Sequence, residues 1–134
     1  MTIQFNPLPE PGDIVWCQFP QQPDLGNPGP KPRPALVVAV SEVDHAIAVV
    51  YGTSQKTHQL YPGEFVLDPG DGGFHVSGLT VRTKFDLGTK IQLHFDSDWF
   101  SPSPGVHIAS PLPKLGMLHP SYMQDLIKAS RQIT

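Results

Sequence analysis

Short apolar runs separated by proline, glycine and small polar residues make up most of the chain up to about residue 95. Residues 35–40 and 46–51 are continuous apolar runs, which is typical of central strands covered on both faces. The polar residues 41–44 form a short link between them. We therefore expect these two strands to pair antiparallel.

Residues 14–19 alternate as a strand does, with Ile14, Trp16 and Gln18 on one face and Val15, Cys17 and Phe19 on the other. Because both faces are largely apolar, we expect one of them to contact a partner chain. Further strands are predicted over residues 63–67, 78–81 and 90–95, and a turn over 68–73. In the last strand apolar and polar residues alternate, so one face should be buried.

One helix is predicted, over residues 120–133. Pro120 suits a first helical position. Spacings of three and four residues then give one mostly apolar face. That face consists of Met123, Leu126, Ile127, Ser130 and Ile133. The expected fold class is mainly β: about five to seven strands in a small, strongly bent sheet or barrel, with this C-terminal helix.

Proline-rich segments predict the irregular parts of the chain. Residues 1–11 should form an irregular arm, and 20–32, with five prolines and two glycines, a loop. Residues 101–113 are rich in proline and serine and should form another loop. A loop as long as 20–32 is uncommon in a small domain unless it has a function or is disordered.

Length and composition point to one domain over residues 1–134. A single cysteine, Cys17, permits no internal disulfide and fits a reducing compartment. We see no secretion signal and no apolar run near the roughly 20 residues of a membrane span. The expected location is the cytoplasm.

The net charge of −3 argues against a broad, non-specific nucleic-acid binder, which is normally basic. The distribution of charge leaves two interpretations open: a local positive site, or scattered solvated side chains. Six of the nine basic residues lie in the central part of the chain: Lys31, Arg33, Lys56, Arg82, Lys84 and Lys90.

Four motifs, taken in order, resemble the PemK/MazF family, the toxin half of many bacterial toxin–antitoxin pairs. Residues 11–16 read Pro-Gly-Asp-Ile-Val-Trp, and residues 31–38 read Lys-Pro-Arg-Pro-Ala-Leu-Val-Val. Residues 49–55 end a strand in Gly-Thr-Ser-Gln, and 78–87 give a weaker match. The resemblance covers roughly residues 11–95.

The resemblance implies an SH3-like β-barrel with a C-terminal helix, usually a homodimer. It also implies a metal-independent endoribonuclease that cleaves single-stranded mRNA at short motifs and inhibits growth. The implied partner is an antitoxin whose disordered tail covers the RNA groove, and no cofactor is implied. The alternative is a non-catalytic module on the same barrel that binds protein or nucleic acid, because a small barrel hosts many functions.

The same resemblance makes Arg33 and Thr53 the catalytic residues. An arginine fork can grip two phosphate oxygens, and a threonine hydroxyl can donate a hydrogen bond to a phosphate oxygen. Antiparallel pairing would place both at one end of the sheet. The plainer interpretations are a solvated arginine at a strand start and turn chemistry for Thr53.

Ser54, Gln55, Lys31 and Lys56 are the candidate substrate-binding residues around this pair. The proton acceptor is left open by the sequence, since an arginine rarely acts as a base. His58 is a minor candidate for proton transfer. The six histidines show no close pairing at metal-ligand spacing, so we predict no metal site.

Overall fold

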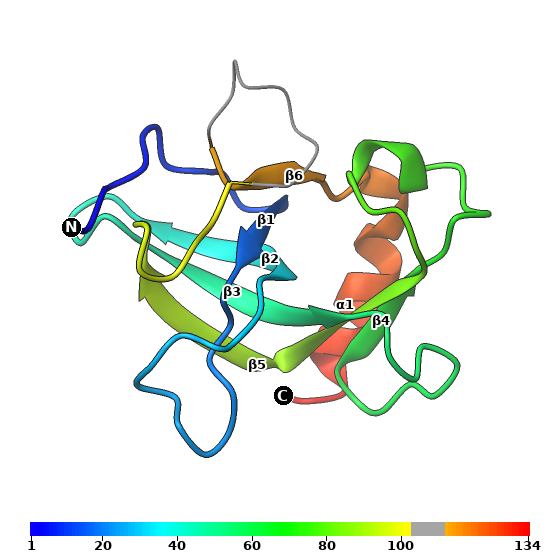
Figure 1. Cartoon of the computed structure of the whole chain (residues 1–134). Helices are drawn as coiled ribbons and strands as arrows, with labels where there is room; N and C mark the ends of the chain where they lie inside the picture. The colour runs from blue at the N-terminus through cyan, green and yellow to red at the C-terminus, as the bar shows by residue number, and fades with distance from the viewer. Residues whose placement is uncertain (103–111) are drawn as a thin grey trace.

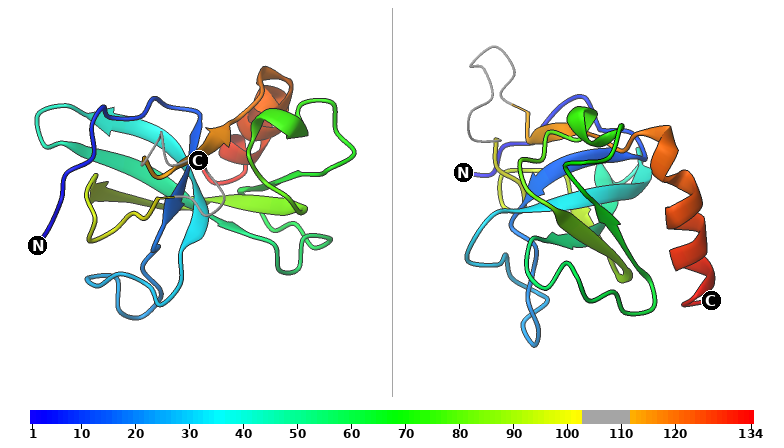
Figure 2. Two further views of the ribbon diagram at one scale, coloured as in Figure 1. Left: turned by 45° about the horizontal axis from the view of Figure 1, so that its top comes forward. Right: turned by 90° about the vertical axis from the view of Figure 1, so that its right-hand side faces the viewer.

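The computed structural model describes residues 1–102 and 112–134. Six strands form one antiparallel sheet in the order β4-β5-β3-β2-β1-β6. The sheet is strongly curled, and helix α1 lies beside one side of it (Figures 1 and 2). The elements are β1 (Asp13–Cys17), β2 (Arg33–Ser41), β3 (Ala46–Thr53), β4 (Glu64–Leu67), β5 (Thr83–His94), β6 (Lys114–Met117), the 3₁₀ turns η1 (Phe74–Val76) and η2 (Pro120–Tyr122), and α1 (Met123–Arg131). This confirms the mainly β class, a small barrel-like sheet with a C-terminal helix.

The alternation of side chains along the strands gives the sheet two buried clusters, one on each face. Ile14 belongs to the cluster that packs under α1, while Val15 and Cys17 belong to the other. Both faces of β1 are thus covered by this chain itself. The apolar residues on both faces of β1 are explained by the core of this chain, so they no longer support a contact with a partner chain.

The predicted strands 14–19, 35–40, 46–51 and 63–67 correspond to β1, β2, β3 and β4, and the antiparallel pairing of β2 with β3 is confirmed. The strand predicted at 78–81 was wrong. Gly78 has a positive φ of 73°, and a Cβ there would collide with the Leu115 carbonyl, so the chain passes close to β6 without pairing as a strand.

Strand β5 is much longer than predicted, with 12 residues. The alternation predicted for its last part is confirmed, since Leu93 is buried while Gln92 and His94 are exposed. In the pairing with β3, Ile91 lies opposite Val49, but Asp86 lies opposite Tyr51. The extra residues of β5 form a bulge at this point, and a bulge bends a strand and redirects its side chains.

The helix begins at Pro120 as predicted, with one 3₁₀ turn before α1. The predicted apolar face was partly wrong. Leu126 packs on the core, but Met123, Ile127 and Ile133 are exposed. The buried face is instead formed by Tyr122, Leu126 and Ala129, because helix spacing from Tyr122 puts these three on one side.

Tyr122 fixes the start of α1 to the turn after β4. Its hydroxyl donates to Asp71 Oδ2 at 2.8 Å, and its ring is buried. Burial and then Asp71 raise the pKa of Tyr122 above its usual range, so the hydroxyl stays a donor. We expect Tyr122→Phe to lower the free energy of unfolding by about 1 kcal/mol, measured by urea titration. An unchanged midpoint would show that water replaces this bond at no cost.

The arm at 1–11 is irregular, as predicted, and is held against the sheet. The Phe5 N–H donates to the Phe95 carbonyl at 3.1 Å, and His45 Nε2 lies 2.8 Å from the Phe5 carbonyl oxygen. Of the loop predicted at 101–113, residues 103–111 lie outside the described residues. No helix in the described part of the chain is long and apolar enough to cross a membrane.

Candidate active site

The antiparallel pairing of β2 and β3 places Arg33 and Thr53 at the same end of the sheet. Ala35 lies opposite Tyr51. The pairing ends there: Arg33 lies two residues before Ala35 on β2, and Thr53 lies two residues after Tyr51 on β3. Because alternate residues share a face, both lie on the face that carries Ala35 and Tyr51. The start of one strand and the end of the next therefore bring an arginine and a threonine together at one end of the sheet.

Gly52 keeps the two strands close at this end. A Cβ on Gly52 would lie 2.6 Å from the Pro34 carbonyl oxygen and 2.7 Å from Cε1 of the buried Phe85 ring. Neither neighbour is free to move, since one is backbone and the other is packed in the core. The absence of a side chain at position 52 thus holds Thr53 against β2.

Arg33 is half-buried, and its Nε atom is buried without a hydrogen-bond partner. Across residues 1–102 and 112–134, no carboxylate lies within ion-pair distance of its guanidinium. A buried N–H without an acceptor is costly, and an oxyanion that reaches it removes that cost. Among the described residues the guanidinium thus has no anionic partner, which suits it to bind an anion.

Thr53 begins the turn that follows β3. Its Oγ1 accepts the backbone N–H of Gln55 at 3.0 Å, which fixes the side chain and leaves its O–H hydrogen available to donate. Lys56 adopts a positive φ of 52° and reverses the chain. Ser54, Gln55 and Lys56 are exposed in this turn, and Lys31 is exposed just before β2. The four predicted substrate-binding residues thus lie in segments that adjoin Arg33 and Thr53.

Lys84 lies opposite Thr53 in the register of β3 and β5. It is therefore on the same face of the sheet as Thr53, one strand further from Arg33. Its charge is already balanced: Nζ lies 3.0 Å from Glu64 Oε1 and 2.9 Å from the Gln59 carbonyl oxygen, with both side chains buried. No local sequence pattern predicts this pair, because the two residues are 20 positions apart in the chain.

The Arg82 Nε, like that of Arg33, is buried without a hydrogen-bond partner among the described residues, but the two terminal nitrogens of Arg82 are engaged. Its Nη1 donates to Asp68 Oδ1 at 2.7 Å, and its Nη2 lies 3.5 Å from the Thr57 carbonyl oxygen. The hydrogen bond from Arg82 is the main reason that the pKa of Asp68 is lowered. Arg82 therefore ties the turn after β3 to the turn after β4, and in this structure its charge serves that link.

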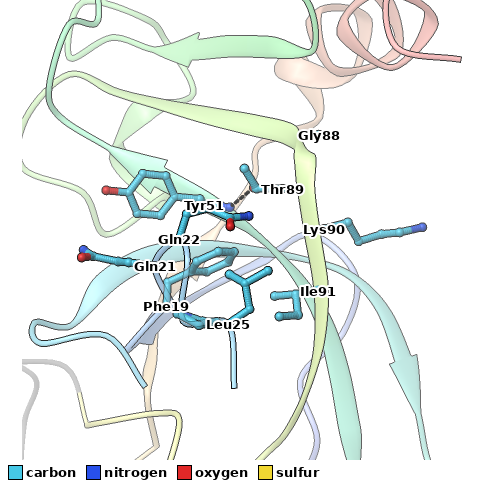
Figure 3. Close-up of a pocket in the computed structure, with 10 residues that line it drawn as sticks. Phe19, Gln21, Gln22, Leu25, Tyr51, Gly88, Thr89, Lys90 and Ile91 are labelled. Carbon is cyan, nitrogen blue, oxygen red and sulfur yellow. Dashed lines mark hydrogen bonds between the residues drawn. The ribbon is translucent and has the colours of Figure 1, made fainter. Parts of the chain in front are cut away.

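A cavity of about 520 Å³ opens on the same face, beside Tyr51 (Figure 3). Its lining consists of Phe19, Pro20, Gln21, Gln22, Leu25, Tyr51, Gly88, Thr89, Lys90 and Ile91. The sequence did not predict this cavity, because it depends on the bulge of β5 and on the path of the 20–32 loop. His58, the minor candidate for proton transfer, is exposed. Within the described ranges no three His, Cys, Asp or Glu side chains are grouped so as to hold a metal ion.

Comparison with known proteins assigns the chain to a family. The curated proteins gave no match. Residues 10–86 match the sequence model of the PemK-like, MazF-like toxins of type II toxin–antitoxin systems. The matched segment is more than half of the 134 residues, and it contains the strands that carry Arg33 and Thr53. The chain therefore belongs to the PemK-like, MazF-like toxin family.

Proposed function

We propose that the protein is a metal-independent endoribonuclease that cleaves single-stranded mRNA at short motifs and thereby inhibits growth. The observation that carries the proposal is that Arg33, whose buried Nε has no acceptor among the described residues, begins β2 at the end of the sheet where Thr53 ends β3. An arginine and a hydroxyl donor side by side form a site for a phosphodiester. Family membership adds support, since the family consists of toxins.

The proposed reaction is attack of a ribose 2′-hydroxyl on the adjacent phosphorus. The 2′-oxygen–phosphorus bond forms while the bond to the 5′-oxygen breaks. The products are a 2′,3′-cyclic phosphate and a 5′-hydroxyl, so the 2′-hydroxyl loses a proton and the leaving oxygen gains one. Arg33 and Thr53 stabilise the negative charge that builds on the phosphate oxygens, a role that needs fixed donors and no metal.

The neighbouring exposed residues are assigned to substrate binding. Lys31 and Lys56 would attract the backbone phosphates, while Ser54 and Gln55 would hydrogen-bond the RNA. The proposed setting is the cytoplasm, with the protein as a homodimer controlled by an antitoxin. Both β1 faces are buried within the chain, so a dimer would have to use another surface.

The test is to incubate the purified protein, in EDTA, with a long single-stranded RNA and to map the cut ends. We expect cleavage that survives chelation, at one short motif, with 2′,3′-cyclic phosphate ends. Intact RNA at high concentrations of the wild-type protein would overturn the proposal. Tight binding of a non-cleavable RNA without any cleavage would instead support the non-catalytic binding module.

A further inference from the structure

The cavity beside Tyr51 combines an apolar floor with amide groups at its edge. Figure 3 shows Phe19, Leu25 and Ile91 together at its base, with Gln22 above them and Gln21 extending to the left. The rings of Phe19 and Tyr51 lie 5.3 Å apart at 55° to each other. Such a lining suits a flat, apolar ligand with polar edges.

Tyr51 is held in place by the bulge of β5. The Tyr51 N–H donates to Thr89 Oγ1 at 2.8 Å, and the Thr89 hydroxyl donates to the Asp86 carbonyl at 2.6 Å. A single threonine therefore both closes the bulge and fixes the backbone of Tyr51. The backbone that carries the Tyr51 ring is thus held at the cavity wall, which lowers the entropic cost of stacking a ligand on the ring.

Leu25 shows that the cavity is incompletely covered. Its side chain is 42% exposed although it lies at the cavity, which leaves apolar surface in contact with water. None of the described lining residues is acidic. The Lys90 side chain points away from the other lining residues (Figure 3). The cavity thus offers a partly apolar site whose described lining carries no acidic side chain.

The cavity adjoins the proposed phosphate site. Tyr51 and Thr53 are next-but-one neighbours on β3 and share a face, so they are roughly 6.6 Å apart along the strand. A strand of RNA that places a phosphate at Arg33 and Thr53 would therefore bring a neighbouring base to Tyr51.

We infer that this cavity binds one unpaired nucleobase of the RNA and selects it. The base stacks on Tyr51 over the apolar floor, and the amides of Gln21 and Gln22 hydrogen-bond its edge, as in the recognition of single-stranded RNA generally. The inference rests on the proposed nuclease function and assigns to these residues the choice of one base in the cleaved motif.

Two variants test this assignment. Tyr51→Leu keeps an apolar wall but removes the stacking surface, and we expect it to weaken binding of a non-cleavable 2′-O-methyl RNA by about fivefold to 150-fold. The double change Gln21→Ala and Gln22→Ala lies at the exposed edge and leaves the core intact. We expect it to make the cleaved motif degenerate at one position. Gln92→Ala, an exposed glutamine on β5, is the matched control and should change neither property.

The probes are 2′-O-methyl ten-residue homopolymers of A, C, G and U, measured by fluorescence anisotropy, and the mapped cleavage motif of a long RNA. If all variants cleave RNA at the unchanged motif and bind the homopolymers with unchanged affinity, the proposed base-binding cavity is wrong. The proposed nuclease function would still stand. Wild-type protein that cleaves no RNA would overturn the proposed function. The homopolymers would then still test the cavity, because loss of base-dependent binding in Tyr51→Leu does not depend on cleavage.

Discussion

Replacing Arg33 by alanine should lower the rate of RNA cleavage by about 10²–10³-fold, the loss seen when one preorganised donor to a reaction-centre oxyanion is removed. The guanidinium has no carboxylate partner among the described residues, and its Nε is buried without an acceptor. Its charge is thus available to the phosphate. The change should leave the fold largely unaffected, because Arg33 lies at the first position of β2 and packs in neither buried cluster.

Arg33→Lys should restore little of this activity. A lysine keeps the charge but offers one ammonium group in place of a planar fork, and no atom that replaces the buried Nε. If charge alone were needed, the lysine variant would instead retain most of the rate. The comparison of the two variants therefore separates bidentate binding from simple attraction.

The measurement is the single-turnover cleavage rate of an oligonucleotide that contains the mapped site. Single-turnover conditions report the chemical step without product release. Arg131→Ala, which removes an exposed arginine at the end of α1, is the matched control and should cleave at the wild-type rate. Full activity of Arg33→Ala would remove Arg33 from the site without refuting cleavage itself.

The parts of the fold that the sequence predicted are those with a strong local pattern. Two continuous apolar runs marked β2 and β3, and their short link dictated antiparallel pairing. That pairing also brought Arg33 and Thr53 to one end of the sheet. Their shared end of the sheet follows from local sequence together with the antiparallel rule, which is why it was predictable.

The errors lie where distant segments decide the local structure. Residues 78–81 have β-forming side chains, yet Gly78 passes β6 too closely to continue as a strand. The short strand β6 was not predicted, because it contains a glycine, Gly116, which is untypical of strands. The glycine is needed there because a Cβ would collide with the backbone of Ser77. On α1 the buried face was misplaced because Tyr122 enters the core. Such contacts have no signature in any local window of sequence.

Lys84 illustrates the same limit within the candidate site. Its register beside Thr53 suggests a second cation for the substrate, but its side chain is turned to Glu64 and the Gln59 carbonyl. The ring of Tyr61 lies 5.4 Å from Nζ, and the Tyr61 N–H donates to the same Glu64 oxygen at 2.7 Å. Lys84, Glu64 and Tyr61 therefore satisfy one another, and their contacts join β4 to β5.

Removing either partner of this pair should therefore destabilise the protein strongly. Both side chains are buried, at 6% and 9% exposure. Lys84→Met leaves a buried carboxylate, and Glu64→Leu leaves a buried ammonium. Each change should lower the free energy of unfolding by about 3–5 kcal/mol, because an uncompensated charge remains out of water. The double variant should lose much less than either single variant, since apolar side chains replace both charges.

Urea unfolding of the four proteins gives the coupling energy between the two side chains by a double-mutant cycle. Losses in the single variants that simply add in the double variant would contradict the interpretation of a buried, mutually dependent pair. The cleavage rate of the double variant then separates structure from chemistry. If Lys84 only joins β4 to β5, the double variant cleaves RNA close to the wild-type rate. If the ammonium also binds phosphate, the rate falls although the fold is restored, and Lys84 joins Arg33 and Thr53 in the site.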